Sequence, residues 1–365
     1  MAERKLTSVI LAAGIGTRMR SERPKPLHLL CGRAMLLHVL DAVAELEVER
    51  AVVVVGHGAE RVTKKLIELG PNGLPIDFVV QAEQRGTGDA LMAGLTAFPD
   101  DDVDDGDLLV LPGDTPLLLS DTLAHLVSTH RKAEAAATLL TARLNDPTGY
   151  GRVIRDKGNR IVRIVEQADS TPEEALVDEV ATSIYCFRRS LVAPALRRLD
   201  PENAQGEYYL TDVIEVLGAA GYPIASYVVE DALEIVGVND RAQLAAAEAE
   251  LRRRTNQKWM SLGVTMIDPA QTYVDATVEL APDVTLFPGT ILQGRTRVGS
   301  GAEIGPNSQL IDCVVGDDAV VAKTVGDNAE IGSQAHVGPF AYLGPGTVIA
   351  KGEVIGPFYN GNSRT

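Results

Sequence analysis

Aromatic residues and positive charge are the two scarcest features of this sequence. Phe, Trp and Tyr together make up 4% of the 365 residues, and 34 Lys and Arg stand against 50 Asp and Glu, which gives a formal net charge of −16. Few aromatic rings argue against base-stacking platforms for single-stranded nucleic acid. An acidic chain also lacks the basic face that grips a phosphate backbone. We therefore expect no nucleic-acid partner. A small phosphorylated ligand, which needs only a few local cations, is still compatible with this composition.

Cysteines and long apolar runs are also sparse. Cys31, Cys186 and Cys313 are odd in number and widely separated, so they predict isolated thiols rather than a disulfide framework or a metal site. No apolar run reaches the ~20 residues that span a bilayer. The N-terminus lacks the apolar segment and cleavage site of a secretory signal. We expect a cytoplasmic protein without membrane association.

Short apolar runs alternate with helical segments up to about residue 240. Buried strands are predicted for four runs, at 8–14, 50–58, 76–82 and 107–114. Apolar residues at helical spacing predict three intervening helices, at 34–46, 59–69 and 87–98. This alternation predicts a Rossmann-like α/β domain with a mostly parallel sheet. In such sheets the ligand binds outside the carboxyl ends of the strands.

The sequence predicts a connecting helix at 239–263. After it, the spacing of apolar residues changes to a short repeat. Val-Gly and Ile-Gly pairs recur mostly in steps of six, and from Val325 the register is expected to continue through Ile331, Val337, Leu343, Ile349 and Ile355. Between 310 and 325 the step shortens to about five. A six-residue apolar repeat predicts a short left-handed parallel β-helix, whose stacked coils bury the apolar column. We therefore expect three parts: a first domain at 1–238, the connecting helix at 239–263, and the β-helix at 264–365.

The stretch "LAAGIGTRM" places two glycines, Gly14 and Gly16, directly after the first predicted strand. It lacks the third glycine of the dinucleotide fingerprint, because Met19 stands there, and it lacks the Gly-Lys-Ser/Thr of a Walker loop. Arg18 and Lys25, the latter between two prolines, add positive charge nearby. Backbone N–H groups and two cations predict a polyphosphate site. A tight turn without a ligand is the alternative.

Oxygen ligands for a cation are predicted at two further strand ends. Asp114 in "VLPGDTPL" offers a carboxylate, and Asn239 in "EIVGVNDR" offers an amide oxygen. Mg²⁺ prefers oxygen ligands and commonly bridges substrate phosphates, so these two residues predict a Mg²⁺ site. Helix capping is the alternative for both.

Eight ordered blocks, together with the hexapeptide segment, give the chain a specific resemblance. They are "LAAGIGTRMRSERPKPLHLLCGRAMLLHVL", "VVVVGHG", "QAEQRGTGDA", "LPGDTPL", "DPTGYGRV", "IVEQADST", "NAQGEYYLTDVI" and "GVNDRAQL". Over nearly its whole length the chain resembles the bifunctional N-acetylglucosamine-1-phosphate uridyltransferase/glucosamine-1-phosphate acetyltransferase family. The resemblance implies a nucleotide-sugar pyrophosphorylase fold and a Mg²⁺-dependent reaction. UTP and N-acetylglucosamine 1-phosphate would give UDP-N-acetylglucosamine and pyrophosphate.

The resemblance also implies roles for individual residues. Catalytic contacts to the triphosphate would come from Arg18 and Lys25. Nucleotide contacts would come from Leu11, Ala12, Ala13, Gly14, Gln81, Gly86 and Thr87. Sugar contacts would come from Asp114, Gly151, Glu166, Ala181 and Asn239, and Mg²⁺ ligation from Asp114 and Asn239. No protein nucleophile is required, because the attacking phosphate oxygen is already anionic.

Several positions depart from the family pattern. The family has an asparagine in an Asn-Thr/Ala-Gly motif where this chain reads "EVATSIYCF", with Ala181 and Ser183. Asp89 stands where the family generally has histidine, and Pro112 where a polar or aromatic residue is common. Losing a side chain that hydrogen-bonds to the substrate relaxes or redirects the specificity for the sugar. Another sugar or cyclitol 1-phosphate, or another nucleotide such as GTP, is therefore the second hypothesis, and an inactive nucleotide-sugar-binding scaffold is the third.

The β-helix of this chain is short for the family. By resemblance, the acetyltransferase residues lie in later coils and a C-terminal tail, so acetyl transfer is expected to be absent. The β-helix that remains is expected to form a homotrimer.

Overall fold

The computed structural model describes residues 4–98 and 106–361. Two compact units make up the chain: unit 1 comprises residues 1–28 and 34–243, and unit 2 comprises residues 29–33 and 244–365. Among the described residues, no helix has both the length and the apolar character needed to cross a bilayer.

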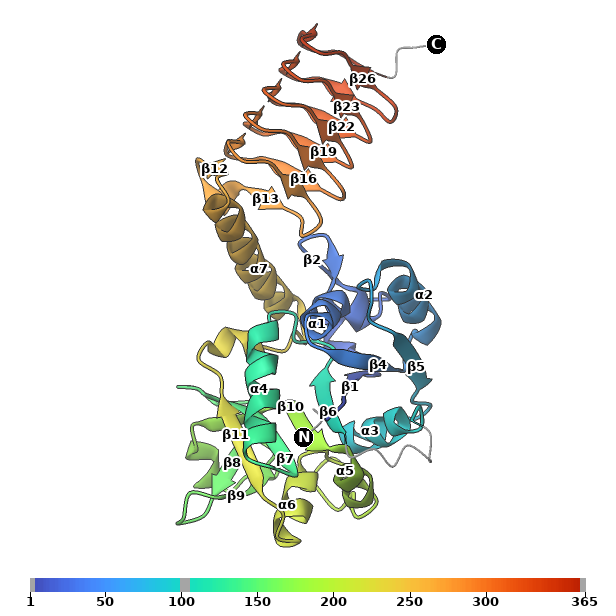
Figure 1. Ribbon diagram of the computed structural model, residues 1–365, viewed down its shortest axis with the longest axis vertical. Coiled ribbons are helices and arrows are strands. Elements are labelled where there is room, and N and C mark those ends of the chain that lie inside the picture. Colours follow the sequence, from blue (N-terminus) through green and yellow to red (C-terminus); the bar gives the residue numbers. More distant parts are fainter. Residues whose placement is uncertain (1–3, 99–105, 362–365) are drawn as a thin grey trace. The chain divides into compact units, whose positions relative to one another are not determined.

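Unit 1 is built on one nine-stranded sheet (Figure 1). Seven strands follow the order β11-β7-β10-β6-β1-β4-β5, and β8 pairs with β10 and with β9. The strands are β1 (Leu6–Ala12), β4 (Val48–Val55), β5 (Ile76–Val80), β6 (Asp107–Pro112), β7 (Ala137–Arg143), β8 (Gly151–Arg155), β9 (Ile161–Val165), β10 (Glu179–Arg188) and β11 (Ile224–Val228). A small pair, β2 (Leu29–Leu30) and β3 (Arg33–Ala34), stands apart from this sheet.

Helices cover both faces of the sheet (Figure 1). They are α1 (Met35–Ala44), α2 (Ala59–Leu69), α3 (Thr87–Leu95), α4 (Ser120–Lys132), α5 (Arg189–Leu196) and α6 (Asp212–Ala219). Successive strand residues point to opposite faces, so Ile10 packs in the core with α1, α2 and α4, while Val9 packs with α3, α5 and α6. A strand buried on both faces reads as a continuous apolar run, which is why β1, β4 and β6 were predictable. The expected burial is wrong for β5, which is the last strand of the sheet and whose residues are half-buried or exposed.

Four strand ends meet at one edge of the sheet. β1 is parallel to β4 and β6, and β4 is parallel to β5. β10 runs antiparallel to β6, so its first residues lie at the same edge. This arrangement confirms the predicted α/β fold. The strands after residue 136 were not specified by the sequence pattern.

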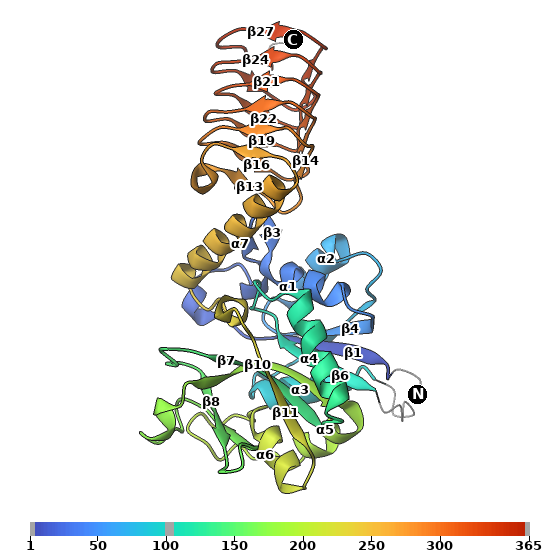
Figure 2. The same ribbon diagram turned by 60° about the vertical axis from the view of Figure 1, so that its left-hand side comes forward.

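Unit 2 is a parallel β-helix, which confirms the fold expected from the hexapeptide repeat (Figure 2). Its strands form sheets of six, five and five members. The first is β12 (Thr265–Met266), β15 (Thr285–Leu286), β18 (Glu303–Ile304), β21 (Val320–Val321), β24 (His336–Val337) and β27 (Val354–Ile355). The second is β13 (Tyr273–Val274), β16 (Ile291–Gln293), β19 (Gln309–Ile311), β22 (Val325–Asp327) and β25 (Tyr342–Leu343). The third is β14 (Glu279–Leu280), β17 (Arg297–Val298), β20 (Val314–Val315), β23 (Glu330–Ile331) and β26 (Val348–Ile349). Helix α7 (Arg241–Ser261) precedes it.

The expected register is wrong at Val325. Its side chain is exposed, and Gly326 takes the inward position between Leu310 and Leu343. A Cβ on Gly326 would lie 2.9 Å from Leu310 Cδ2 and 3.1 Å from Cys313 Sγ, so neighbouring side chains already fill that space. From Ile331 onward the predicted inward column is correct, because Ile331, Val337, Leu343, Ile349 and Ile355 are all buried.

The three cysteines are buried free thiols, as the sequence predicted. Burial raises the pKa of Cys31, Cys186 and Cys313 above the ordinary value of a thiol. The thiolate is the nucleophilic form, so none of the three is poised for covalent chemistry.

A buried carboxylate anchors the edge of the sheet opposite to these strand ends. Asp107 begins β6, is fully buried, and pairs with Arg4 at 3.0 Å and with Arg131 at 2.8 Å. Burial by itself raises the pKa of Asp107, but hydrogen bonds with His130 and Arg131 outweigh it and hold the pKa below the ordinary value. The ionised form is thus favoured by the fold.

We predict that Asp107→Asn lowers the free energy of unfolding by about 3–5 kcal/mol, because it leaves two arginines without their shared counter-charge. The matched control is Asp77→Asn on β5, whose exposed pair with Arg50 at 3.2 Å is worth at most about 1 kcal/mol. Urea denaturation of both variants at pH 7 measures the difference. Equal losses of unfolding free energy in the two variants would contradict the assignment of Asp107 as a buried anchor of the sheet.

Candidate functional site

The Lys25 ammonium joins two of the oxygens predicted to bind a cation. Its Nζ donates to the Asp114 carboxylate and, at 2.8 Å, to the carboxamide Oδ1 of Asn239. The Lys25 and Asp114 side chains are only 13% and 26% exposed. Three residues predicted from separate segments therefore share one site.

Backbone hydrogen bonds fix the segments that carry these oxygens. Asp114 follows β6, where the Gly113 N–H donates to the Leu11 carbonyl at 2.8 Å. The Val238 N–H donates to the Asp114 carbonyl at 2.9 Å, which holds the residue before Asn239 against the β6 end. The site is thus tied to the end of β1 and to the start of α7.

The opening glycine loop comes close to Lys25. Gly16 has φ 68°, and a Cβ there would lie 2.7 Å from Lys25 Cβ, so only glycine lets the loop pass over this lysine. A Cβ on Gly14 would meet nothing within 4 Å, so this part of the loop faces open space. Arg18 lies two residues beyond Gly16 in the turn Thr17–Met19, and its side chain is exposed. Among the described residues it pairs with no carboxylate.

The oxygens around Lys25 suit a hard divalent cation. A carboxylate and a carboxamide oxygen both bind one ammonium, so they converge on a single cation position. Mg²⁺ is commonly held by one or two protein oxygens plus substrate phosphates. Within residues 4–98 and 106–361, no group of three or more His, Cys, Asp or Glu could hold a metal. The donor set therefore fits a substrate-bridged Mg²⁺ rather than an all-protein site.

The residues predicted to meet the nucleotide lie at the ends of β1 and β5. Leu11 and Ala12 end β1, and Ala13 follows it. Gln81 follows β5, is buried, and donates through Nε2 to Asp89 at 2.7 Å and to the Gly86 carbonyl at 3.4 Å. The hydroxyl of Thr87 accepts the Leu210 N–H at 3.1 Å, so it supports the loop instead of standing free.

Residues predicted to meet the sugar gather where β8 pairs with β10. Gly151 pairs with Ala181, and a Cβ on Gly151 would lie 3.5 Å from Glu166 Oε2. The Thr211 hydroxyl donates to Glu166 Oε1 at 3.0 Å. Gly151, Glu166 and Ala181 therefore lie together.

The "ATS" stretch in β10 is a local irregularity. The register shifts between Ala181 and Tyr185, and Ser183 has φ 61°. The left-handed region costs a non-glycine residue about 1 kcal/mol, which explains why the family pattern has glycine there. Thr182 donates to the Leu140 carbonyl at 2.8 Å and holds the bulge in place. Ala181 is buried and presents only a methyl group.

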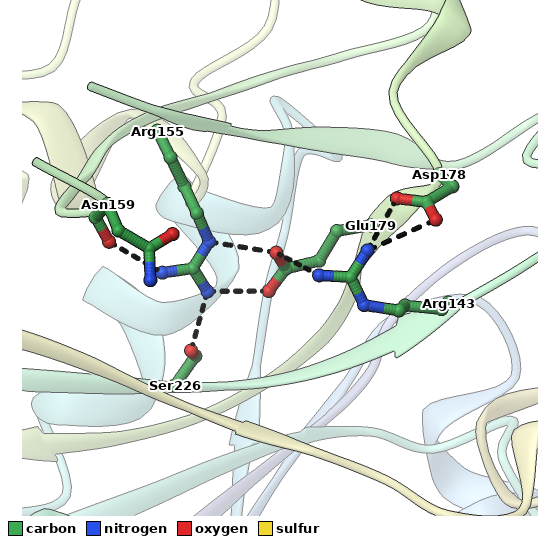
Figure 3. A network of polar contacts seen from close by, with 6 residues as sticks. All are labelled: Arg143, Arg155, Asn159, Asp178, Glu179 and Ser226. Atoms are coloured by element: carbon green, nitrogen blue, oxygen red, sulfur yellow. Dashed lines mark hydrogen bonds and ion pairs between the residues drawn. The ribbon is translucent and has the colours of Figure 1, made fainter. Parts of the chain in front are cut away.

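A polar network braces the strand just before Ala181 (Figure 3). Glu179 accepts from Arg155 Nε at 2.8 Å and from Arg155 Nη2 at 2.7 Å. Arg155 also donates to Ser226 Oγ at 2.8 Å, and Arg143 lies on the other side of Glu179 at 3.9 Å. These contacts join β7, β8, β10 and β11, so the strands that carry Gly151 and Ala181 are held rigidly.

Two neighbouring carboxyls, those of Glu166 and Asp212, have raised pKa values. Burial raises the pKa of Glu166, although the Thr211 hydrogen bond opposes this. Burial, followed by the charges of Glu166, Glu215 and Asp169, raises the pKa of Asp212 to about 6. Asp212 lies in the first turn of α6, where the helix dipole favours a carboxylate, so desolvation and like charge are the stronger effects.

Sequence reasoning missed three residues of the site. Burial, followed by the charge of Asp114, raises the pKa of Tyr150, which directly precedes Gly151 in the sequence. Thr211 orients Glu166, and Arg85 donates to Asp89 at 3.0 Å. Tyr150 and Thr211 lie inside the quoted blocks "DPTGYGRV" and "NAQGEYYLTDVI", but nothing in their spacing distinguishes them from structural residues.

Comparison with known proteins matches residues 7–266 to the nucleotidyl transferase family. Bifunctional protein GlmU of Desulfitobacterium hafniense (strain DSM 10664 / DCB-2) is 47% identical over 324 residues, which cover 89% of this chain and 69% of that protein. Bifunctional protein GlmU of Thermobifida fusca (strain YX) is 46% identical over 331 residues, with 90% and 68% covered. Its namesake from Mycolicibacterium vanbaalenii is 48% identical over 324 residues, with 88% and 65% covered.

A domain with a mostly parallel sheet, whose sequence matches this family, defines a nucleotidyltransferase enzyme. The chain belongs to the nucleotidyl transferase family and is a homologue of the bifunctional GlmU proteins.

We predict that Asp212→Asn stabilises the protein by about 2–3 kcal/mol at pH 7.5 and has little effect at pH 4. The pKa of Asp212 is raised from 3.8 to about 6 in the fold, so its contribution is fully present below pH 3.8 and is lost as the pH rises through about 6. Chemical denaturation at several pH values measures this dependence.

The matched control is Asp121→Asn, an exposed aspartate in the first turn of α4. It should leave stability unchanged or slightly lower it, since it loses only a favourable interaction with the helix dipole. A gain at pH 7.5 that persists unchanged at pH 4 would refute the assignment for Asp212.

Proposed function

We propose that this enzyme joins a nucleoside triphosphate to a sugar 1-phosphate, releasing pyrophosphate, with UTP and N-acetylglucosamine 1-phosphate as the default pair. The observation that carries the proposal is the Lys25–Asp114–Asn239 constellation beside a glycine loop that faces open space. The glycine loop and cations suit a triphosphate, and the Gly151–Glu166 region suits the hydroxyl groups of a sugar.

The reaction needs no protein nucleophile. A phosphate oxygen of the sugar 1-phosphate attacks the α-phosphorus of the triphosphate, a new P–O bond forms, and the bond to the β-phosphate breaks, so that pyrophosphate leaves with the electron pair. Arg18 and Lys25 would neutralise the phosphate charge, and the β1 loop would hold the triphosphate in line for attack. Glu166 and Thr211 would orient the sugar.

Asp114 and Asn239 would hold the Mg²⁺ that we propose as cofactor. When bound, Mg²⁺ supplies charge neutralisation and orientation of phosphate oxygens. Lys25, which binds both oxygens in this structure, would then be free to contact phosphate.

Ala181 favours a second candidate within the same chemistry. Its buried methyl group replaces the asparagine of the family pattern and cannot bond a substituent of the sugar. A site without that partner discriminates less between sugars, so another sugar or cyclitol 1-phosphate is the alternative acceptor, with GTP as an alternative nucleotide.

We predict pyrophosphate release when the protein is incubated with Mg²⁺, UTP and N-acetylglucosamine 1-phosphate. Asp114→Ala should lower kcat at least about 100-fold, since it removes both a cation ligand and the partner of Lys25. Asp121→Ala on α4 is the control and should retain full activity.

A panel of nucleoside triphosphates and sugar 1-phosphates decides between the candidates. Turnover restricted to another acceptor or another nucleotide would support the second candidate. Nucleotide binding without turnover of any pair would contradict the proposed function and leave the inactive scaffold. Full activity of Asp114→Ala would refute the proposed cation site.

We also propose that the β-helix assembles a homotrimer. One outward column of the second sheet is uncharged and runs through Tyr273, Ile291, Gln309, Val325 and Tyr342. A second outward column of the same sheet, Gln293, Ile311 and Asp327, contains one acid. The outward columns of the other two sheets include charged residues such as Glu303, Arg297 and Glu330. Interface cores are depleted of charge, so the second sheet is the better face for a symmetric contact.

Light scattering coupled to gel filtration tests this assignment. We predict that Val325→Glu converts the trimer to monomer, while Val348→Glu, at an exposed position on the third sheet, leaves the trimer intact. A wild-type monomer, or a trimer that survives Val325→Glu, would contradict it.

We further propose that the catalytic domain is residues 1–238, joined by a helix at 239–263 to the β-helix at 264–365. We also propose that the protein is located in the cytoplasm. The absence of acetyl transfer remains a prediction, which an assay with acetyl-coenzyme A and glucosamine 1-phosphate would check.

A further inference from the structure

Gln81, Asp89 and Arg85 form a chain of hydrogen bonds at the end of β5. Gln81 Nε2 donates to Asp89 Oδ2 at 2.7 Å, and Arg85 donates to the other carboxylate oxygen of Asp89 at 3.0 Å. The Gln81 side chain is buried, Asp89 is nearly so, and Arg85 lies largely in solvent. Gln81 Nε2 also faces the Gly86 carbonyl at 3.4 Å.

These neighbours permit only one orientation of the Gln81 amide. The two groups that face Nε2, the Asp89 carboxylate and the Gly86 carbonyl, are both hydrogen-bond acceptors. The amide group directed toward them must therefore be the NH₂ donor. If the amide were reversed, its oxygen would face two other oxygens. The Gln81 Oε1 therefore points the other way, and in the described part of the chain no group donates to it.

Backbone hydrogen bonds hold the loop that carries Arg85 and Asp89 in place. The Tyr208 N–H donates to the Arg85 carbonyl at 2.8 Å, and the Gly88 N–H donates to the Tyr208 carbonyl at 2.8 Å. Gly86 between them has φ 110°, and a Cβ there would lie 2.6 Å from the Tyr208 carbonyl oxygen. Asp89 therefore stands in the first turn of α3 on a loop that cannot easily turn it away.

We propose that Asp89, held by Arg85, locks Gln81 as a hydrogen-bond acceptor and thereby selects a nucleobase that presents a ring N–H. The inference rests on the proposed function, in which Gln81 meets the base. Uracil carries such an N–H between two carbonyl groups. Cytosine carries an unprotonated ring nitrogen at the same place, whose lone pair would face Oε1.

Asp89 is thus a positioning residue for Gln81. It attracts the NH₂ group of the Gln81 amide and repels the amide oxygen. To accept cytosine, the Gln81 amide would have to turn its oxygen toward the Asp89 carboxylate. Two acceptors facing each other without a donor between them repel, so the Asp89 carboxylate disfavours cytosine although it does not contact the base itself.

Asp89→Asn is the decisive variant, because asparagine has the same shape but can present either NH₂ or oxygen to Gln81. We expect the ratio of kcat/KM for UTP to that for CTP to fall at least tenfold, mainly through a lower KM for CTP, with kcat for UTP within about threefold of wild type. Asp77→Asn on β5 is the control and should keep the wild-type ratio.

Calorimetric binding of UTP and CTP without sugar phosphate gives a second measurement that needs no turnover. Arg85→Gln, at a largely exposed side chain, gives a second variant that tests the same clamp should Asp89→Asn unfold, and it should lower the ratio at least threefold. A wild-type protein that binds CTP as well as UTP, or a ratio unchanged in both variants, would overturn the inference.

Failure of the proposed function gives a different result. If no sugar 1-phosphate is turned over, that function fails, while the UTP-to-CTP binding ratio still tests the clamp. GTP also carries a ring N–H, so tighter binding of GTP than of UTP would support the acceptor orientation and contradict UTP as the default nucleotide.

Discussion

A lysine ammonium shared by a carboxylate and a carboxamide is the interaction on which the site depends. Lys25 lies 89 positions from Asp114 and 214 positions from Asn239, so no local segment can bring these groups together. The parallel sheet does so by ending β1 and β6 at one edge and by fastening Val238 to the Asp114 carbonyl. Gly16 then closes the loop over Lys25. Any change that shifts β1 against β6 is therefore expected to disturb the Lys25–Asp114 contact as well.

The part of the site around Glu166, where we propose that the sugar binds, lowers the stability of the protein. Glu166 and Asp212 have raised pKa values, so their ionised forms oppose folding, and Ser183 holds a left-handed backbone conformation. The Arg155–Glu179 pair beside them is fully satisfied and supports the strained strand. Backbone strain and unfavourable charge therefore occur together, next to a well-paired set of ionic contacts. This combination is typical of a binding site and not of a hydrophobic core.

The sequence predicted the parts of this structure that depend on local pattern. Buried strands such as β4 read as apolar runs, and the inward column of the β-helix was correct from Ile331 onward. The column failed at Val325 because shortened turns move Gly326 inward, which a fixed period of six cannot express. That the glycine loop approaches phosphate stays a prediction, and its local pattern did not indicate that Gly16 approaches Lys25. The contact of Gln81 with Asp89 depends on how a loop turns into α3, and the proximity of Tyr150 to Asp114 depends on the tertiary fold. No spacing in the sequence encodes either.

Pairing of acidic with basic side chains explains how a protein with a net charge of −16 could bind the polyanionic ligand that we propose. On the side of the proposed nucleotide, each carboxylate named in the site has a cation: Asp114 has Lys25, and Asp89 has Arg85. On the side of the proposed sugar, Glu166 and Asp212 have no ion pair among the described residues, and burial, followed by neighbouring carboxylates, raises the pKa of both. Phosphate groups repel an uncompensated carboxylate, whereas the hydroxyl groups of a sugar donate hydrogen bonds to one. The distribution of paired and unpaired acids therefore agrees with the proposed direction of the ligand, in which its phosphates would face Lys25 and its hydroxyl groups would face Glu166.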